Sequence, residues 1–139
     1  MPDRIPPHAF RQRVVASEAD IDELGHVNNA VWVRWIQDVA VAHWYSLATA
    51  QEHEAAYWVV TRHEIDYRAA LLPGEAAIGA TWVPDPPRGA RFDRRVAFVR
   101  EGDGKLLIDA RTTWAMIDRA SGRPLRVPSE LAERFRAGI

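Results

Sequence analysis

The sequence predicts an α+β fold in which one antiparallel sheet wraps around a long central helix. Residues 28–48 are apolar around almost the whole circumference of a helix, which is typical of a helix buried inside a fold. After this segment the chain alternates polar and apolar residues with a period of two, as strands do, and short turns join the alternating runs. Short connections favour antiparallel neighbours. A sheet curved around the helix would bury both the helix and the concave face of the sheet.

The predicted elements follow one another simply. A short strand over residues 13–17 comes first, and the long helix begins where Asn28 or Asn29 can cap its free N–H groups. Pro128 opens a short amphipathic helix near the end of the chain. Between the two helices we predict four strands, over residues 59–67, 75–83, 91–101 and 105–118. One face of the first of these four strands would carry Val59, Thr61, His63, Ile65 and Tyr67.

Length and composition limit the class of protein. The 139 residues suffice for one hydrophobic core, so we treat residues 1–139 as a single domain. A formal net charge of −1 gives no electrostatic basis for binding nucleic acid or an anionic membrane. No apolar run approaches the ~20 residues that span a bilayer, and the first residues lack a signal-peptide core. We therefore expect a soluble, cytoplasmic protein.

Some chemistry is excluded by residue types. The sequence has no cysteine, which excludes a thiol nucleophile, a disulfide framework and thiolate metal sites. It contains neither a Gly-x-Ser-x-Gly elbow nor a His-Glu-x-x-His helix, and its five histidines do not stand at metal-ligand spacing. We expect no metal and no cofactor.

The most informative segment is DIDELGHVNN, residues 20–29, which links the first strand to the long helix. Its acidic and amide residues gather where helix N–H groups are unpaired and carry partial positive charge. Such a helix end can stabilise an oxyanion, and a carboxylate beside it can act as base or nucleophile in acyl transfer. A structural role explains the same residues, because Asn28 or Asn29 can be a helix cap and Gly25 a turn residue.

Three motifs, in this order, resemble the hot-dog-fold acyl-CoA thioesterases, in particular the 4-hydroxybenzoyl-CoA thioesterase-like group. The first and most specific is DIDELGHVNNA; the others are IDYR followed by LPGE, and DRASGRP followed by VP. The resemblance implies a hot-dog fold, acyl-CoA as substrate, and active sites at the interface of a homodimer, either alone or within a dimer of dimers. An open sheet around one helix also leaves strand edges unpaired, which favours association.

The resemblance assigns roles within the first motif. Asp22, three residues before Gly25, corresponds to the family's catalytic carboxylate, as nucleophile or general base. The backbone N–H of Asn29 corresponds to the group that polarises the thioester carbonyl. Asp20 competes with Asp22 but stands five residues before the glycine. His26 is similar to a histidine that assists catalysis in acyl-carrier-protein thioesterases, although the partnering upstream asparagine is missing here; a hydrogen-bonded packing role is the alternative.

Further residues are candidates for substrate binding. Gly25, His26 and Asn28 lie beside the carboxylate in sequence, and Thr61 and His63 would line an acyl pocket unless they are core residues with satisfied polar atoms. Arginine suits phosphate groups, so coenzyme A could bind at either of two arginine clusters, although solvated strand ends would look the same. The clusters are Arg88, Arg91, Arg94 and Arg95, and Arg119, Arg123 and Arg126.

We therefore expect an acyl-CoA thioesterase that releases a free acid and coenzyme A. A thioesterase acting on acyl carrier protein is the alternative within enzymes, and a dehydratase is less consistent with an acid that precedes the helix. A non-catalytic acyl-CoA-binding hot-dog protein is the alternative outside enzymes, but it has no need of a carboxylate near an anionic product. The six tryptophans suit either an acyl tunnel or packing in the core and at a dimer interface.

Overall fold

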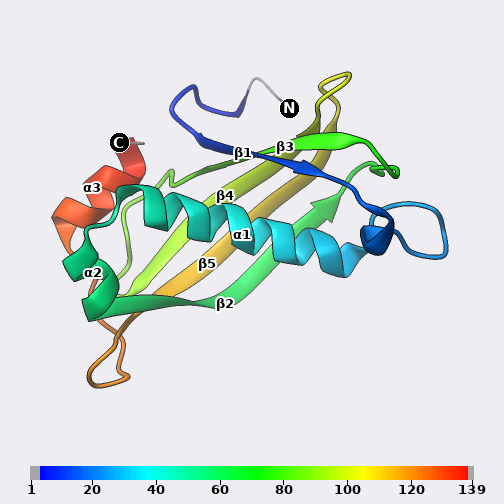
Figure 1. Cartoon of the computed structure of the whole chain (residues 1–139). Helices are drawn as coiled ribbons and strands as arrows, with labels where there is room; N and C mark the ends of the chain where they lie inside the picture. The colour runs from blue at the N-terminus through cyan, green and yellow to red at the C-terminus, as the bar shows by residue number, and fades with distance from the viewer. Residues whose placement is uncertain (1–3, 138–139) are drawn as a thin grey trace.

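The computed structural model describes residues 4–137 as one curved sheet around a central helix (Figure 1). The five strands are antiparallel and lie in the order β1-β3-β4-β5-β2. This is the predicted α+β, hot-dog arrangement. In chain order the elements are β1 (Phe10–Val15), a 3-10 turn (Glu18–Asp20), α1 (Asn29–Leu47), α2 (Ala50–Ala55), β2 (Ala56–Tyr67), β3 (Ala76–Trp82), β4 (Arg91–Arg100), β5 (Leu106–Asp118) and α3 (Ser129–Ala137).

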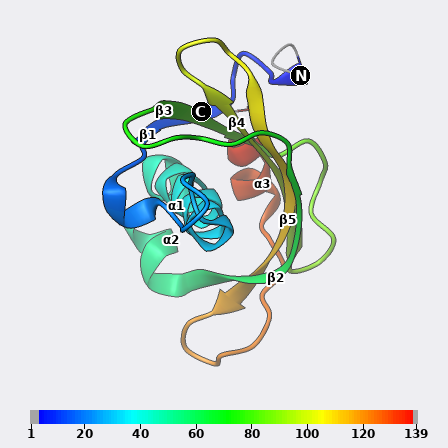
Figure 2. The ribbon, with the colours of Figure 1, turned by 90° about the vertical axis from the view of Figure 1, so that its right-hand side faces the viewer.

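The long helix α1 lies in the hollow of the sheet, as the view along its axis shows (Figure 2). One side of the helix is buried against the strands, through Trp32, Ile36, Val39 and other apolar residues. The opposite side is open, because Arg34, Asp38, Val41 and Tyr45 are exposed. The helix is therefore covered on one side only, and the open side is wider than the narrow polar stripe that the sequence predicted.

A short second helix, α2, was not predicted from the sequence. Its start is a capping box, in which the Thr49 hydroxyl accepts from the Glu52 N–H at 3.1 Å and the Glu52 carboxylate accepts from the Thr49 N–H at 2.8 Å. The Thr-x-x-Glu signal was therefore present in the sequence. α2 reverses the chain, so β2 begins at Ala56 and runs antiparallel to α1.

The predicted inner face of β2 is confirmed at His63 and Ile65 and is wrong at Val59 and Thr61, because a β-bulge interrupts the strand. Pairing with β5 slips between Val60 and Arg62, so Thr61 has no direct partner. Before the bulge the inward residues are even-numbered, as at Trp58 and Val60; after it they are odd-numbered, as at His63. Thr61 and His63 therefore do not share one continuous inner row.

Two hydrophobic clusters lie between α1 and the sheet. The cluster at the N-terminal half of α1 includes Trp32, Ile36 and Phe98, and the Phe98 ring fills the space that a side chain at Gly79 would occupy. The cluster at the C-terminal half is richer in aromatic residues and extends to α3 through Phe135. Most of the six tryptophans pack in or against these clusters: Trp32, Trp35, Trp44 and Trp58. Within residues 4–137, no helix is long and apolar enough to cross a membrane.

Candidate active site

The segment before α1 folds into a tight turn that presents Asp22. The Asp22 N–H donates to the His26 carbonyl at 3.0 Å, and the Gly25 N–H donates to the Asp22 carbonyl at 3.0 Å. Gly25 adopts a positive φ of 87°, a conformation that glycine reaches without strain. Ile21 and Val27 pair across the base of the turn. The turn therefore depends on Gly25, and it holds Asp22 just before the start of the helix.

The Asp22 carboxylate is half-buried and only partly used by the fold. Its Oδ1 accepts a hydrogen bond from the Leu24 N–H at 2.9 Å, which fixes the side chain in the turn. Its Oδ2 has no hydrogen-bond partner among the described residues. One carboxylate oxygen is therefore available to a substrate or to a water molecule.

Asp20 has a structural role. Its carboxylate accepts from the Ser17 N–H and the Ser17 hydroxyl, each at 3.0 Å, and from Arg34 at 3.4 Å. The Ser17 N–H lowers the pKa of Asp20 against the raising effect of burial, and the Ser17 hydroxyl and Arg34 lower it further. The Asp20 carbonyl also accepts from the Asn28 N–H at 2.9 Å, so this residue anchors the entrance to the helix.

Among the described residues, one N–H group at the N-terminus of α1 has no acceptor. Asn28 is the cap, because its side-chain oxygen accepts from the Ala30 N–H at 2.8 Å. Asn29 is the first helical residue and is exposed. Its own N–H has no acceptor within residues 4–137. An unpaired N–H at the positive end of a helix is the kind of group that stabilises an oxyanion.

The other predicted binding residues, His26, His63 and Thr61, lie in different parts of the fold. His26 is half-buried in the turn beside Asp22, and its ring has no hydrogen bond to a described residue. His63 faces α1, with its Nε2 at 3.4 Å from Gln37 Nε2, and burial lowers its pKa. Its Nδ1 is buried without a partner in the described part of the chain. Thr61 is exposed and donates to the Thr113 carbonyl at 3.2 Å, away from the row that holds His63.

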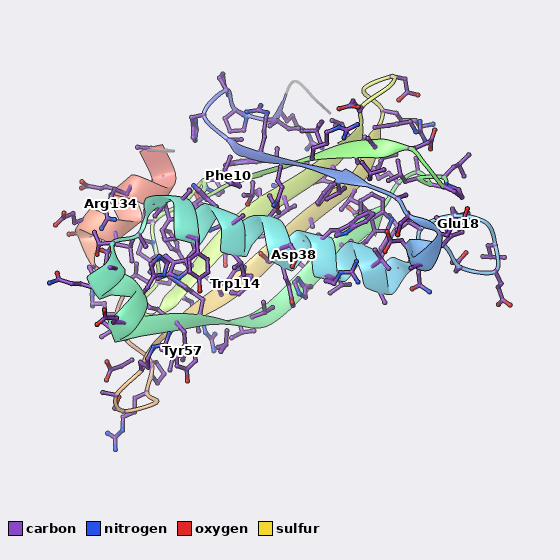
Figure 3. The ribbon with its side chains drawn as sticks, viewed as in Figure 1. Phe10, Glu18, Asp38, Tyr57, Trp114 and Arg134 are labelled. Carbon is purple, nitrogen blue, oxygen red and sulfur yellow. The ribbon has the colours of Figure 1, made fainter. Side chains whose placement is uncertain are left out.

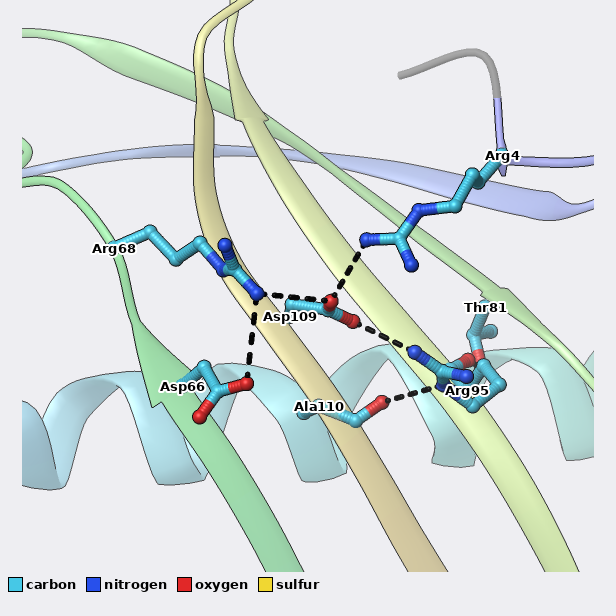
Figure 4. A network of polar contacts seen from close by, with 7 residues as sticks. All are labelled: Arg4, Asp66, Arg68, Thr81, Arg95, Asp109 and Ala110. Atoms are coloured by element: carbon cyan, nitrogen blue, oxygen red, sulfur yellow. Dashed lines mark hydrogen bonds and ion pairs between the residues drawn. The ribbon is translucent and has the colours of Figure 1, made fainter. Parts of the chain in front are cut away.

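The first arginine cluster is not one site, because its members lie on both faces of the sheet. Arg88 pairs with Asp93 at 3.0 Å, and Arg95 pairs with Asp109 at 2.9 Å. Asp109 also pairs with Arg4 at 3.2 Å and with Arg68 at 3.8 Å, and Figure 4 shows the three arginines around it. Arg94 points to the opposite face and is buried. Arg91 is exposed and forms no ion pair with a described residue.

The second arginine cluster is more open. Arg119 donates to the carbonyls of His53 and Ala56, at 3.1 and 3.4 Å. Arg123 and Arg126 are exposed, and their guanidinium groups have no partner in the described part of the chain. Two of the three arginines therefore remain free for an anionic ligand.

The second arginine cluster lies at the end of the molecule opposite Asp22, whereas Arg95 of the first cluster shares Asp109 with Arg68, just after the end of β2. The Val27 N–H donates to the Leu71 carbonyl, which places the turn near the end of β2. The second cluster follows Asp118, which pairs with Ala56 at the start of β2. Figure 3 shows this separation, with Glu18 at one end of α1 and Tyr57 and Arg134 at the other. The 19 residues of α1 span about 28 Å.

Comparison with known proteins identifies the family. A family model described as the thioesterase-like superfamily matches residues 17–135. The chain belongs to the thioesterase-like superfamily. Thioester hydrolysis is the activity that this membership supports. Comparison with curated protein sequences finds no significant match.

Solved structures of other thioesterases share the fold. A thioesterase from Thermus thermophilus, in complex with coenzyme A and Zn, has a TM-score of 0.80 at 23% identity, and the match covers 94% of this chain and 93% of the other. A 1,4-dihydroxy-2-naphthoyl-CoA thioesterase from Synechocystis has a TM-score of 0.74 at 16% identity, with 87% and 90% covered. An acyl-ACP thioesterase from Bacteroides thetaiotaomicron has a TM-score of 0.77 at 23% identity, with 91% and 51% covered. At such identities the likeness is one of fold.

Arg94 is an inward-facing polar residue that was not predicted from the sequence of this thioesterase-like chain. Arg94 lies between Phe92 and Val96 on the face of β4 that packs toward the helix. The alternation of β4 already placed Phe92, Val96 and Phe98 on one side, so the same period placed Arg94 there too. The period of two therefore predicts an inward-facing Arg94, whereas proximity in sequence groups it with Arg91 and Arg95.

Proposed function

We propose that this protein hydrolyses acyl-CoA thioesters, with Asp22 as the catalytic carboxylate and the Asn29 N–H as the oxyanion donor. The observation that carries the proposal is that two polar groups without hydrogen-bond partners lie at the same turn. These groups are the Asp22 Oδ2 and the Asn29 N–H, which have no partner among the described residues. Asp20 is the weaker candidate, because both of its oxygens are held by the fold.

The chemistry follows from these two groups. As a general base, Asp22 takes a proton from water, and the resulting hydroxide adds to the thioester carbonyl carbon. As a nucleophile, the carboxylate adds to the carbonyl carbon, the carbon–sulfur bond breaks to leave a mixed anhydride, and water then hydrolyses the anhydride. In both routes the carbonyl oxygen becomes negative and accepts from the Asn29 N–H. In the general-base route the carbon–sulfur bond then breaks, and the proton held by Asp22 passes to the sulfur of coenzyme A. In the nucleophilic route the released thiolate takes up a proton from solvent, and both routes end with a free carboxylic acid.

The position of the arginines supports a site shared between two copies. Within one chain, Arg123 and Arg126 lie at the far end of α1 from Asp22. β2 is an edge strand with exposed Tyr57, Val59 and Tyr67. If two copies pair antiparallel through β2, the start of one β2 lies beside the end of the other. The free arginines of one copy then approach the Asp22 turn of its partner, where they can bind the phosphates of coenzyme A.

The experiment that tests the proposal is a hydrolysis screen over short, long and aromatic acyl-CoAs. Released coenzyme A is detected with a thiol reagent, and the absence of cysteine from the protein removes the background. We expect turnover of at least one acyl-CoA. If only thioesters of acyl carrier protein are hydrolysed, these are the substrates in place of acyl-CoA. If acyl-CoA binds tightly without turnover, the protein is a non-catalytic acyl-CoA-binding protein.

Sedimentation velocity at micromolar concentration tests the shared site separately. The proposal requires a dimer, or a dimer of dimers, under the conditions of the assay. A monomer with full activity would contradict the shared site and leave the hydrolysis itself intact.

A further inference from the structure

A pocket of about 180 Å³ lies under the C-terminal half of α1, at the opposite end of the helix from Asp22. Seven of its fifteen lining residues are aromatic: Trp44, Tyr45, Tyr57, Trp58, Phe92, Trp114 and Phe135. A cavity of roughly 150 Å³ is enough for a benzene molecule. This pocket therefore has room for one aromatic ring with a small substituent.

A buried arginine also lines this pocket. Arg94 is only 6% exposed. Its Nη1 donates to His43 Nδ1 at 2.9 Å and to the Thr81 hydroxyl at 3.0 Å. Its guanidinium carbon lies 5.3 Å from the centre of the Phe135 ring. These contacts fix the group in place, while its Nε and Nη2 donate to none of residues 4–137.

No negative charge balances Arg94 in the described part of the chain. The groups that face it are uncharged: Thr81 on β3, Phe135 on α3, and Thr112 opposite it on β5. His43 on α1 is neutral near pH 7, because burial, and then the charge of Arg94, lower its pKa to about 3. Burial likewise lowers the pKa of Arg94 to about 9, which still leaves it charged near pH 7.

The nearest acid in sequence, Asp93, is engaged elsewhere. Asp93 also lines the pocket, but alternation along β4 directs its carboxylate to the other face of the sheet from Arg94. Its carboxylate accepts from Arg88, Arg111 and Thr113 at 2.7 to 3.3 Å. A buried charge without a counter-ion is costly to the fold, so its presence beside a cavity favours a function in binding.

A second unsatisfied donor lines the same pocket. The indole Nε1 of Trp58 is buried and has no hydrogen-bond partner among the described residues. Buried indole N–H groups usually find an acceptor. Two donors without acceptors therefore line one aromatic cavity, and a ligand with acceptor oxygens would satisfy both.

We propose that this pocket is a binding site for a small aromatic carboxylate, with the ring between the aromatic walls and the carboxylate on Arg94. The cavity volume fits one ring, the aromatic walls offer stacking, and Arg94 offers a charge-assisted hydrogen bond. The site is distinct from the Asp22 turn of the same chain, and its existence does not depend on hydrolysis. An acid bound here would be a product or an effector of the protein.

Benzoate and its uncharged analogue benzamide test the proposal on the full chain. Binding is measured by titration calorimetry and by the fluorescence of Trp44, Trp58 and Trp114, which line the pocket. We expect benzoate to bind about 10- to 100-fold more tightly than benzamide, the range expected for a hydrogen bond to a charged group. Equal affinity of the two compounds, or no binding of either, would overturn the proposal.

Three variants locate the site. Arg94→Met removes the charge and should abolish the preference for benzoate, without lowering the melting temperature. Ala40→Leu keeps Arg94 but fills a wall of the pocket, so both compounds should lose affinity. Arg13→Met is the matched control, because Arg13 is an exposed arginine that pairs with Glu101 and does not line the pocket. A preference for benzoate that survives in both pocket variants would place the binding elsewhere and refute the site.

Discussion

The two ends of α1 differ in almost every physical respect. The N-terminal end is a glycine turn of polar residues, partly open to solvent, with a carboxylate oxygen and an N–H left unpaired among the described residues. The C-terminal end packs against aromatic side chains, and α2 and α3 lie beside it. Reactive polar groups need access to substrate, whereas a helix needs one firmly packed end to hold those groups in place. The difference indicates that stability and chemistry are separated along one helix.

Truncation of Phe135 should have the largest effect on stability. The ring is 2% exposed and lies 5.4 to 5.9 Å, centre to centre, from those of His43, Trp44, Trp58 and Phe92. We expect Phe135→Ala to lower the free energy of unfolding by about 3–5 kcal/mol, as measured by urea denaturation. The matched control is Leu24→Ala at the tip of the Asp22 turn, where the side chain is 74% exposed and the cost should stay below about 0.5 kcal/mol. Similar costs at the two positions would contradict the separation.

Asp22→Asn should show the opposite pattern. The amide oxygen can still accept from the Leu24 N–H, so the turn and the free energy of unfolding should change little. Turnover should fall by about 10²-fold or more, the scale of losing a general base. Steady-state kinetics and denaturation on the same sample measure both quantities.

Asp20→Asn is the control for this pair of acids. It weakens the contacts to Ser17 and Arg34, so it should reduce stability more than turnover. Loss of turnover in Asp20→Asn alone would move the catalytic role to Asp20, and normal turnover in both variants would remove the proposed mechanism.

The packed end should respond to pH through Glu52. Hydrogen bonds from Arg134 of α3 lower the pKa of Glu52 to about 2, although burial alone would raise it. A lowered pKa in the folded state stabilises the protein above the unfolded value near 4.5, and this contribution is lost as the pH falls toward 2. Glu52→Gln should therefore cost about 1–2 kcal/mol at pH 7, and less at each step below pH 4.5. Urea denaturation across that range measures it; a cost independent of pH would show that charge is not the cause.

The smallest expected effect concerns coenzyme A. Replacing Arg123 and Arg126 together with alanine should raise KM about 3- to 10-fold and leave kcat nearly unchanged, because exposed charge pairs are weak. The same kinetics at higher salt should reduce the difference between wild type and variant. Arg88→Ala is the comparison, since Arg88 is already paired with Asp93. An equal or larger rise of KM in Arg88→Ala would assign the phosphates to the other cluster.

The fold could be predicted from the sequence because its periodic signals are strong. The apolar segment before residue 48 became α1, with Asn28 as its cap, and the four alternating runs became β2 to β5. The phase of β2 could not be predicted, because a bulge changes pairing by one residue without a distinctive residue type at Thr61. The capping box of α2 can be recognised in the sequence, but the helix itself has only 6 residues.

The candidate site divides in the same way. Local features could be predicted from the sequence: Gly25 makes the predicted turn, and Asn28 and Asn29 stand at the start of the helix. Features that depend on tertiary position could not be predicted in this way. Arginines that are neighbours in sequence, such as Arg94 and Arg95, point to opposite faces of β4, and only the three-dimensional arrangement shows which of them remain free.

The strand order has a consequence for synthesis on the ribosome. β1 pairs with β3, and β2 pairs with β5, so the early strands have no partners until residues 76–118 have been made. Until then Trp32, Trp35 and Trp44 have no sheet to cover them, and an exposed apolar helix invites aggregation. The nascent chain can complete its sheet only after Asp118 has left the ribosome, so the apolar face of α1 stays uncovered until most of the chain has been made.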